Sequence, residues 1–235
     1  MITEAIILAG GLGTRLRPAV PDLPKCMAPV AGKPFLHFVL QYFQKQGISK
    51  FVLALGYKHQ LIERFIRDDF AKQGSAIQFS IEKEPLGTGG AVNLACRQIE
   101  GMSFLLVNGD TFFGINVKAL SEFHQSQRAD CCLSLKPMAR ADRYGIVLLN
   151  QDDSIRRFEE KKAHSSGLIN GGVYTLQTES FVKENLPEKF SFEKEYLEKL
   201  YSLRRMFGFR QDKYFIDIGL PEDYERAQIE LPQNM

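Results

Sequence analysis

Cysteine is scarce in this chain of 235 residues, and its four cysteines are not spaced for a metal or a disulfide framework. Cys26, Cys96, Cys131 and Cys132 include no C-x-x-C pair, the spacing typical of zinc sites. Cys131 and Cys132 are neighbours, so they would point to opposite faces of a strand. We therefore expect reduced thiols, as in a cytosolic protein.

The chain also has little net charge and no long apolar run. The formal net charge is only +2, which argues against nucleic acid or an anionic membrane as a partner. No stretch approaches the roughly 18 consecutive apolar residues of a transmembrane helix, and the N-terminus lacks the features of a signal peptide. With 44% hydrophobic and 25% charged residues, the sequence predicts a cytoplasmic globular protein.

Apolar segments of strand length alternate with amphipathic segments of helix length. In the first half, strands are expected at 5–9, 51–55, 77–82 and 102–107, and helices at 34–46, 60–70 and 87–97. This order predicts βα units around a parallel sheet. In the second half, strands are expected at 129–135, 145–149, 155–158 and 169–176, followed by helices at 191–202 and 221–231. The second half therefore adds antiparallel hairpins to the sheet.

A glycine-rich segment, Leu8-Ala9-Gly10-Gly11-Leu12-Gly13-Thr14-Arg15-Leu16, directly follows the first strand. Glycine lets the backbone turn sharply and aim several N–H groups into one concavity that binds phosphate. Arg15, and Lys25 ten residues later, supply the positive charge that a polyphosphate needs. The segment therefore predicts a polyphosphate site at the end of the first strand.

Neither of two common phosphate loops fits this segment. A Walker A loop is excluded because Gly32-Lys33 is followed by Pro34 in place of serine or threonine. The dinucleotide fingerprint G-x-G-x-x-G would require glycine where Leu16 stands, which disfavours a dehydrogenase.

The segment resembles the signature of the sugar-1-phosphate nucleotidyltransferases, G-G-x-G-T-R-L-x-P followed by P-K, here residues 10–18 and Pro24-Lys25. Further blocks similar to that family follow in the family's order, at Glu84-Pro85-Leu86-Gly87-Thr88-Gly89-Gly90-Ala91, Asn108-Gly109-Asp110, Glu159-Glu160-Lys161, Asn170-Gly171-Gly172 and Asp217-Ile218-Gly219. The resemblance spans nearly the whole chain. It implies the transfer of a nucleotidyl group from a nucleoside triphosphate to a sugar 1-phosphate, with release of pyrophosphate.

The resemblance also implies the fold. We expect an α/β protein, a Rossmann-like three-layer sandwich with a predominantly parallel mixed central sheet, of the nucleotide-diphospho-sugar transferase type. One domain is expected, with a nucleotide-binding half at 1–115 and a sugar-binding half at 116–235. Association into a homo-oligomer is left open.

Catalytic roles are implied for Arg15, Lys25 and Asp110. Arg15 would hold the leaving pyrophosphate, and Lys25 would bridge the α-phosphate and the leaving group. Asp110 follows the strand predicted at 102–107, and Asp217 closes a further predicted strand, Tyr214-Phe215-Ile216-Asp217. Ligands collect at such strand ends in an open α/β sheet. By the resemblance the two aspartates hold Mg²⁺, which prefers one or two carboxylates together with phosphate oxygens and water.

Binding roles are implied for two larger sets. Nucleotide binding is expected from Leu8, Ala9, Gly10, Gly11, Gly13, Thr14, Arg15, Lys25, Glu82, Gly87, Thr88, Asn108 and Asp110. Sugar-phosphate binding is expected from Gly145, Glu160, Lys161, Asn170 and Gly171. The glycines after Asn170 also fit a β-bulge, and the pair Gly89-Gly90 is expected to pack its helix close to the ligand.

In detail, several blocks resemble one subgroup, the D-glycero-α-D-manno-heptose 1-phosphate guanylyltransferases, which use GTP. The extra exocyclic hydroxyl of a heptose needs a polar partner, for which Arg143, Tyr144 and Glu193 are candidates. The alternatives are a mannose-1-phosphate guanylyltransferase, a glucose-1-phosphate thymidylyl- or cytidylyltransferase, and a non-catalytic regulatory homologue that binds a nucleotide-sugar. The intact Arg15, Lys25, Asp110, Lys161 and Asp217 favour activity.

Overall fold

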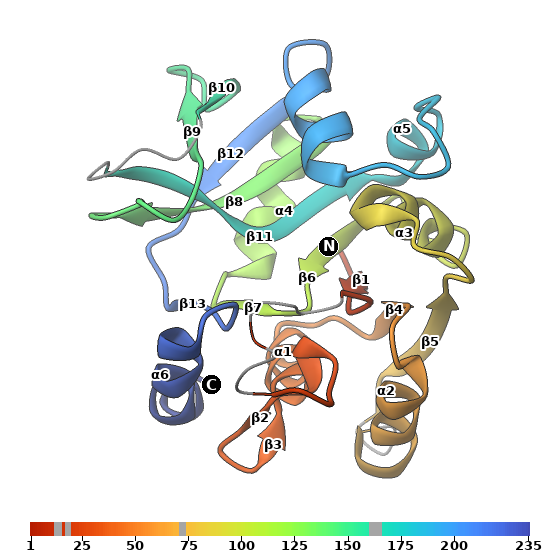
Figure 1. Cartoon of the computed structure of the whole chain (residues 1–235). Coiled ribbons are helices and arrows are strands. Elements are labelled where there is room, and N and C mark those ends of the chain that lie inside the picture. The colour runs from red at the N-terminus through yellow and green to blue at the C-terminus, as the bar shows by residue number, and fades with distance from the viewer. Residues whose placement is uncertain (12–15, 17–19, 71–73, 160–165) are drawn as a thin grey trace.

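A large mixed sheet forms the centre of the protein. The computed structural model describes residues 1–11, 16, 20–70, 74–159 and 166–235. In this part of the chain the main sheet contains β1 (Glu4–Leu8), β4 (Lys50–Leu55), β5 (Ala76–Ile81), β6 (Ser103–Asn108), β8 (Cys131–Met138), β9 (Ile146–Leu149), β10 (Ile155–Glu159), β11 (Gly167–Gln177) and β12 (Met206–Arg210). The strand order is β10-β9-β11-β6-β1-β4-β5, while β8 pairs with β11 and β12 (Figure 1).

The first half of the chain supplies the parallel part of this sheet. β1 lies between β4 and β6 and is parallel to both, and β5 extends the parallel part beyond β4. β11 is antiparallel to β6 and to β8, so it joins the second half of the chain directly to the first. This arrangement confirms the expected parallel core with antiparallel additions.

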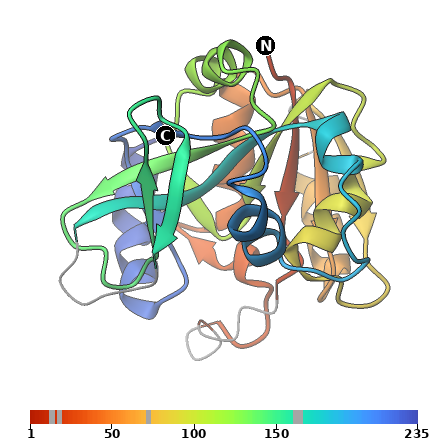
Figure 2. The same ribbon diagram turned by 90° about the horizontal axis from the view of Figure 1, so that it is seen from above.

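Helices flank both faces of the sheet (Figures 1 and 2). The helices are α1 (Phe35–Lys45), α2 (His59–Phe65), α3 (Gly87–Cys96), α4 (Val117–Ser126), α5 (Thr178–Val182) and α6 (Pro221–Gln233), with π-helices η2 (Ile66–Phe70) and η4 (Phe192–Glu198). Because side chains alternate along a strand, Ile7 joins the core beneath α1, α2, α4 and α6, and Ile6 joins the core beneath α3, α5 and η4. The expected three-layer sandwich is confirmed.

A small ribbon links two distant parts of the chain. β7 (Thr111–Phe113) pairs antiparallel with β13 (Phe215–Asp217), and Asp217 is paired with Thr111. This pairing brings Asp217 beside Asp110. Near the first loop, η1 (Lys25–Met27) precedes a short hairpin of β2 (Pro29–Val30) and β3 (Lys33–Pro34).

Several local expectations need correction. The segment expected as one helix at 60–70 divides into α2 and η2, and the helix expected at 191–202 is the π-helix η4. Ser191 does cap it, since its Oγ accepts a hydrogen bond from the Lys194 N–H at 3.2 Å. The elements α4, α5, β7 and β12 were not expected.

The cysteines are all buried and free. Cys131 and Cys132 lie in the two different cores, on opposite faces of β8, as expected. Among the described residues, no helix has the length and apolarity that crossing a membrane requires.

Candidate active site

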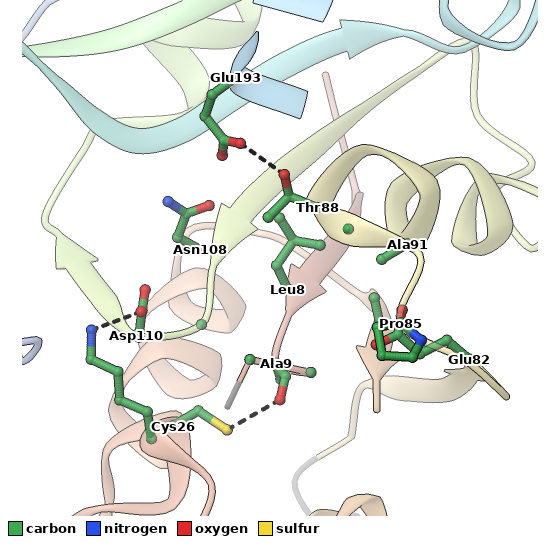
Figure 3. A pocket seen from close by; sticks show the side chains of 16 residues that line it. Leu8, Ala9, Cys26, Glu82, Pro85, Thr88, Ala91, Asn108, Asp110 and Glu193 are labelled. Carbon is green, nitrogen blue, oxygen red and sulfur yellow. Dashed lines mark hydrogen bonds and ion pairs between the residues drawn. The ribbon is translucent and has the colours of Figure 1, made fainter. Parts of the chain in front are cut away.

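A cavity of about 340 Å³ opens at the carboxyl ends of the parallel strands (Figure 3). It is lined by Leu8, Ala9, Gly10, Gly11, Lys25, Cys26, Ala54, Glu82, Pro85, Gly87, Thr88, Ala91, Asn108, Gly109, Asp110 and Glu193. The structure therefore brings together every described member of the nucleotide-binding set. Gly13, Thr14 and Arg15 lie outside the described residues.

Lys25 joins two carboxylates that are far apart in the sequence. Its Nζ donates to Asp110 Oδ2 at 2.7 Å and to Asp217 Oδ1 at 3.1 Å. The Lys25 side chain is only 8% exposed, whereas that of Asp110 is 42% exposed and remains open to the cavity. The Gly219 N–H also donates to Asp217 Oδ1 at 2.8 Å. The site thus has a nearly buried cation between two carboxylates, each held by a different strand end.

This donor set fits Mg²⁺. In the described part of the chain no group of three or more His, Cys, Asp or Glu side chains converges on a metal position. Magnesium, however, is commonly held by one or two carboxylates, with substrate phosphates and water completing its shell. Asp110 and Asp217 provide that pair, and Asp110 is accessible from the nucleotide cavity.

Glu82 is fixed against the glycine loop at the far end of the cavity. Its Oε2 accepts a hydrogen bond from the Leu86 N–H at 3.1 Å. Its Oε1 lies so close to Gly56 that an added Cβ there would be 2.4 Å away. A side chain at position 56 would therefore displace the Glu82 carboxylate, a constraint that no motif in the sequence signalled.

The start of α3 is bound to the start of η4. Thr88 Oγ1 donates to Glu193 Oε2 at 2.7 Å and accepts from the Phe192 N–H at 2.9 Å. A Cβ at Gly89 would lie 2.0 Å from the Phe190 ring, and one at Gly90 would lie 2.4 Å from the Glu188 carbonyl oxygen. The expectation that Gly89 and Gly90 pack against the ligand is therefore wrong. Because these residues lack a Cβ, segment 188–190 can pack directly against their backbone.

A second cavity of about 250 Å³ adjoins the first and shares Glu193 with it. Its lining is Gly145, Ile146, Val147, Phe158, Glu159, Asn170, Glu193, Leu197 and Glu198. It contains two members of the expected sugar-phosphate set, Gly145 and Asn170. Two others, Glu160 and Lys161, lie outside the described residues.

Asn170 is held in one orientation. Its Oδ1 accepts from the Gly172 N–H at 3.1 Å, and its Nδ2 donates to Tyr174 Oη at 2.8 Å. The side chain so held lines the second cavity. Gly171, the fifth expected residue, packs against Phe113, whose ring would lie 2.3 Å from an added Cβ. The register also shifts after Asn170, so the β-bulge interpretation accounts for this glycine.

Cys26 lines the nucleotide cavity without the properties of a nucleophile. Burial raises the pKa of its thiol to about 12, and its Sγ donates to the Ala9 carbonyl oxygen at 3.7 Å. The thiol therefore stays protonated, and its contact fixes η1, which carries Lys25, against the end of β1.

The geometry and the sequence agree with one family of enzymes. The chain belongs to the nucleotidyl transferase family, whose sequence model matches residues 4–234. D-glycero-alpha-D-manno-heptose 1-phosphate guanylyltransferase from Aneurinibacillus thermoaerophilus is 49% identical over 97% of this chain and 98% of that protein. The protein of the same name from Campylobacter jejuni is 46% identical over 94% of this chain and 96% of its own length. The crystal structure of HddC from Yersinia pseudotuberculosis complexed with GMP-PN has a TM-score of 0.88 and 37% identity, covering 97% of this chain and 99% of that one.

Proposed function

We propose that this chain transfers GMP from GTP to D-glycero-α-D-manno-heptose 1-phosphate, with GDP-heptose and pyrophosphate as products. The observation that carries the proposal is the ion-pair cluster of Lys25, Asp110 and Asp217, of which Lys25 and Asp110 line the nucleotide cavity. The choice of sugar and base is supported by two full-length relatives named for this substrate, at 49% and 46% identity.

Glu82 supports guanine as the base. Guanine presents N–H donors on its Watson–Crick edge, and an ionised carboxylate is an acceptor only. Glu82 Oε2 is engaged by the Leu86 N–H, while Oε1 faces the glycine loop beside Gly10 and Gly56. In this role Glu82 accepts from guanine, the one common base with two adjacent donor groups, N1–H and the 2-amino group, on its Watson–Crick edge.

The reaction brings two anions together. An oxygen of the sugar phosphate attacks the α-phosphorus of GTP, the bond from that phosphorus to the bridging oxygen breaks, and pyrophosphate leaves in line. Such transfers depend mainly on positioning and charge neutralisation. Lys25 supplies a fixed positive charge in a nearly buried position, where electrostatic interactions are strongest.

Mg²⁺ is the proposed cofactor, held by Asp110 and Asp217. When bound, the ion supplies further positive charge to the phosphates. Arg15 is proposed to hold the pyrophosphate, Lys161 the phosphate of the sugar, and Glu160 a sugar hydroxyl. Lys25 keeps both aspartates oriented through its two hydrogen bonds.

A substrate matrix tests the proposal. Pyrophosphate release is measured with Mg²⁺ for ATP, GTP, CTP, UTP and dTTP, each against heptose, mannose and glucose 1-phosphates. We expect strong release with GTP and the heptose phosphate. Release with a different pair would keep nucleotidyl transfer and reassign the substrate. Absence of pyrophosphate release with every pair would contradict the proposal and favour a non-catalytic homologue that binds a nucleotide-sugar.

A further inference from the structure

The second cavity has two chemically different walls. Ile146, Val147, Phe158 and Leu197 form an apolar side, and the hydrogen-bonding groups belong to Glu159, Asn170, Glu193 and Glu198. A sugar has matching surfaces, because its C–H groups pack on apolar side chains and its hydroxyls need acceptors and donors. Its position next to the nucleotide cavity fits a sugar attached to the transferred phosphate.

The π-helix η4 places two carboxylates on this cavity. In a π-helix the backbone bonds link residues five apart, whereas in an α-helix residues three or four apart share a face. Glu193 and Glu198 are separated by five residues, and both line the cavity. An α-helix over the same segment would turn one of them away. The π geometry of η4 therefore allows both carboxylates to contact a molecule in the cavity.

The two carboxylates differ in how firmly they are held. Glu193 Oε2 accepts hydrogen bonds from Thr88 Oγ1 at 2.7 Å and from Ser191 Oγ at 2.9 Å. This leaves its Oε1 as the free acceptor. Glu198 is exposed, and its carboxylate has no hydrogen-bond or ion-pair partner among the described residues. Glu193 also borders the nucleotide cavity, whereas Glu198 borders only the second one.

The other two candidates for a heptose contact, Arg143 and Tyr144, do not line the second cavity. Arg143 pairs with the buried carboxylate of Asp223 on α6 at 2.7 Å, and Tyr144 packs edge-on against Phe215. Both line a different cavity, together with Asp217 and Asp223. Of the three carboxylates on the second cavity, that of Glu159 on β10 is paired with Arg157, whereas the two on η4 form no ion pair with the described residues.

We propose that Glu193 and Glu198 determine which sugar the enzyme accepts. Glu193, at the junction of the cavities, accepts hydrogen bonds from ring hydroxyls close to the phosphate. Glu198, five residues farther along η4, accepts them from the exocyclic diol that distinguishes a seven-carbon sugar from a hexose. This inference rests on the proposed function, because it takes a sugar 1-phosphate as the occupant.

The test compares kcat/KM for heptose 1-phosphate and mannose 1-phosphate, with GTP saturating, in the full chain. Glu198→Gln should lose about tenfold or more for the heptose phosphate and clearly less for the mannose phosphate, because one charge-assisted hydrogen bond is lost only with the longer sugar. Glu193→Gln should lose similar factors for both sugars. KM for GTP should change little in Glu198→Gln.

Two further variants make the result specific. Glu122→Gln removes one carboxylate from α4, where the Glu122 side chain is 66% exposed, and should leave both sugars unaffected. Glu198→Asp keeps the charge but shortens the side chain, so it should shift the heptose-to-mannose ratio in the same direction by a smaller factor. This variant also separates an effect on the sugar from a failure to fold.

The outcomes separate this inference from the proposed function. An active wild type with an unchanged heptose-to-mannose ratio in Glu198→Gln would overturn the role of Glu198 and leave the proposed function standing. Equal losses for both sugars in Glu198→Gln would overturn it as well. A wild type silent with GTP and every sugar phosphate would overturn the proposed function and this inference together.

Discussion

At the scale of single residues, Lys25 is the nearly buried cation of the site. Its side chain is 8% exposed and its ammonium contacts two carboxylates. Lys25→Met should lower kcat by about 100-fold or more, the usual effect of removing a preorganised group that stabilises developing charge. Lys118→Met on α4, where the side chain is 67% exposed, is the matched control and should keep full activity. Steady-state pyrophosphate release measures both, and a Lys25→Met variant within about fivefold of wild type would refute this role.

The aspartates make a separate prediction about metal. Chelation with EDTA should abolish activity, and added Mg²⁺ should restore it. Asp110→Asn and Asp217→Asn should each require a higher Mg²⁺ concentration for half-maximal activity, because an amide oxygen is a weaker ligand for this ion than a carboxylate. Asp212→Asn, on an exposed carboxylate paired with Lys136, is the control. The same Mg²⁺ requirement in all variants would remove Asp110 and Asp217 from the metal site.

At the scale of elements, the glycines of α3 make a prediction about stability. Gly89→Ala would place a Cβ 2.0 Å from the Phe190 ring, so the ring and segment 188–190 must move. Overpacking of this kind costs about 1–3 kcal/mol in the free energy of unfolding, measured by urea denaturation. Gly114→Ala is the control, since the nearest atom to its Cβ would be an ordinary 3.6 Å away. Equal free energies of unfolding for the two variants would show that segment 188–190 moves at no cost in stability, which would contradict the prediction.

Elements with a strong apolar pattern were predictable, and those without one were not. β1, β4 and β6 are continuous apolar runs, which is typical of buried parallel strands. α4 escaped prediction because two of its four buried residues, Ser121 and His124, are polar. The pattern of η4 predicts a helix but not its π geometry, which depends on the packing of Phe192, Tyr196 and Leu197 in the core.

The same limit applies to the site. The positions of Lys25, Asp110 and Asp217 in the motifs predicted that they act together. Their hydrogen bonds confirm that they lie together, while their roles stay a prediction. The bond from Thr88 to Glu193 joins residues 105 apart in the sequence, and no local pattern signals it. Contacts of this kind depend on how the two halves of the chain meet, which the motifs do not encode.

At the scale of the whole molecule, a buried histidine sets part of the pH dependence of stability. His124 lies between Thr175, with Oγ1 at 3.0 Å, and Ser103, with Oγ at 3.3 Å, and burial lowers its pKa from 6.5 to about 4. The unfolded state therefore binds more protons between these values, so stability is full above about pH 6.5 and falls as the pH drops toward 4. Burial also lowers the pKa of His37, which adds to the effect in the same direction.

The contribution of His124 across this range is about 3 kcal/mol. His124→Gln should reduce the loss of stability between pH 7 and 4, with the free energy of unfolding measured by urea denaturation at each pH. Gln125→Ala, at an exposed position beside His124 on α4, is the control and should keep the slope of the wild type. A His124→Gln variant with the wild-type slope would contradict the assignment.

With Lys25, Asp110 and Asp217 at its active site, the enzyme should join GMP to a heptose phosphate in preference to hexose phosphates. A competition measures this most directly. Heptose, mannose and glucose 1-phosphates are mixed in equal amounts with limiting GTP, Mg²⁺ and the enzyme, and the nucleotide-sugars formed are identified by mass spectrometry. We expect GDP-heptose to be the main product. A mixture dominated by GDP-mannose or GDP-glucose would contradict this expectation.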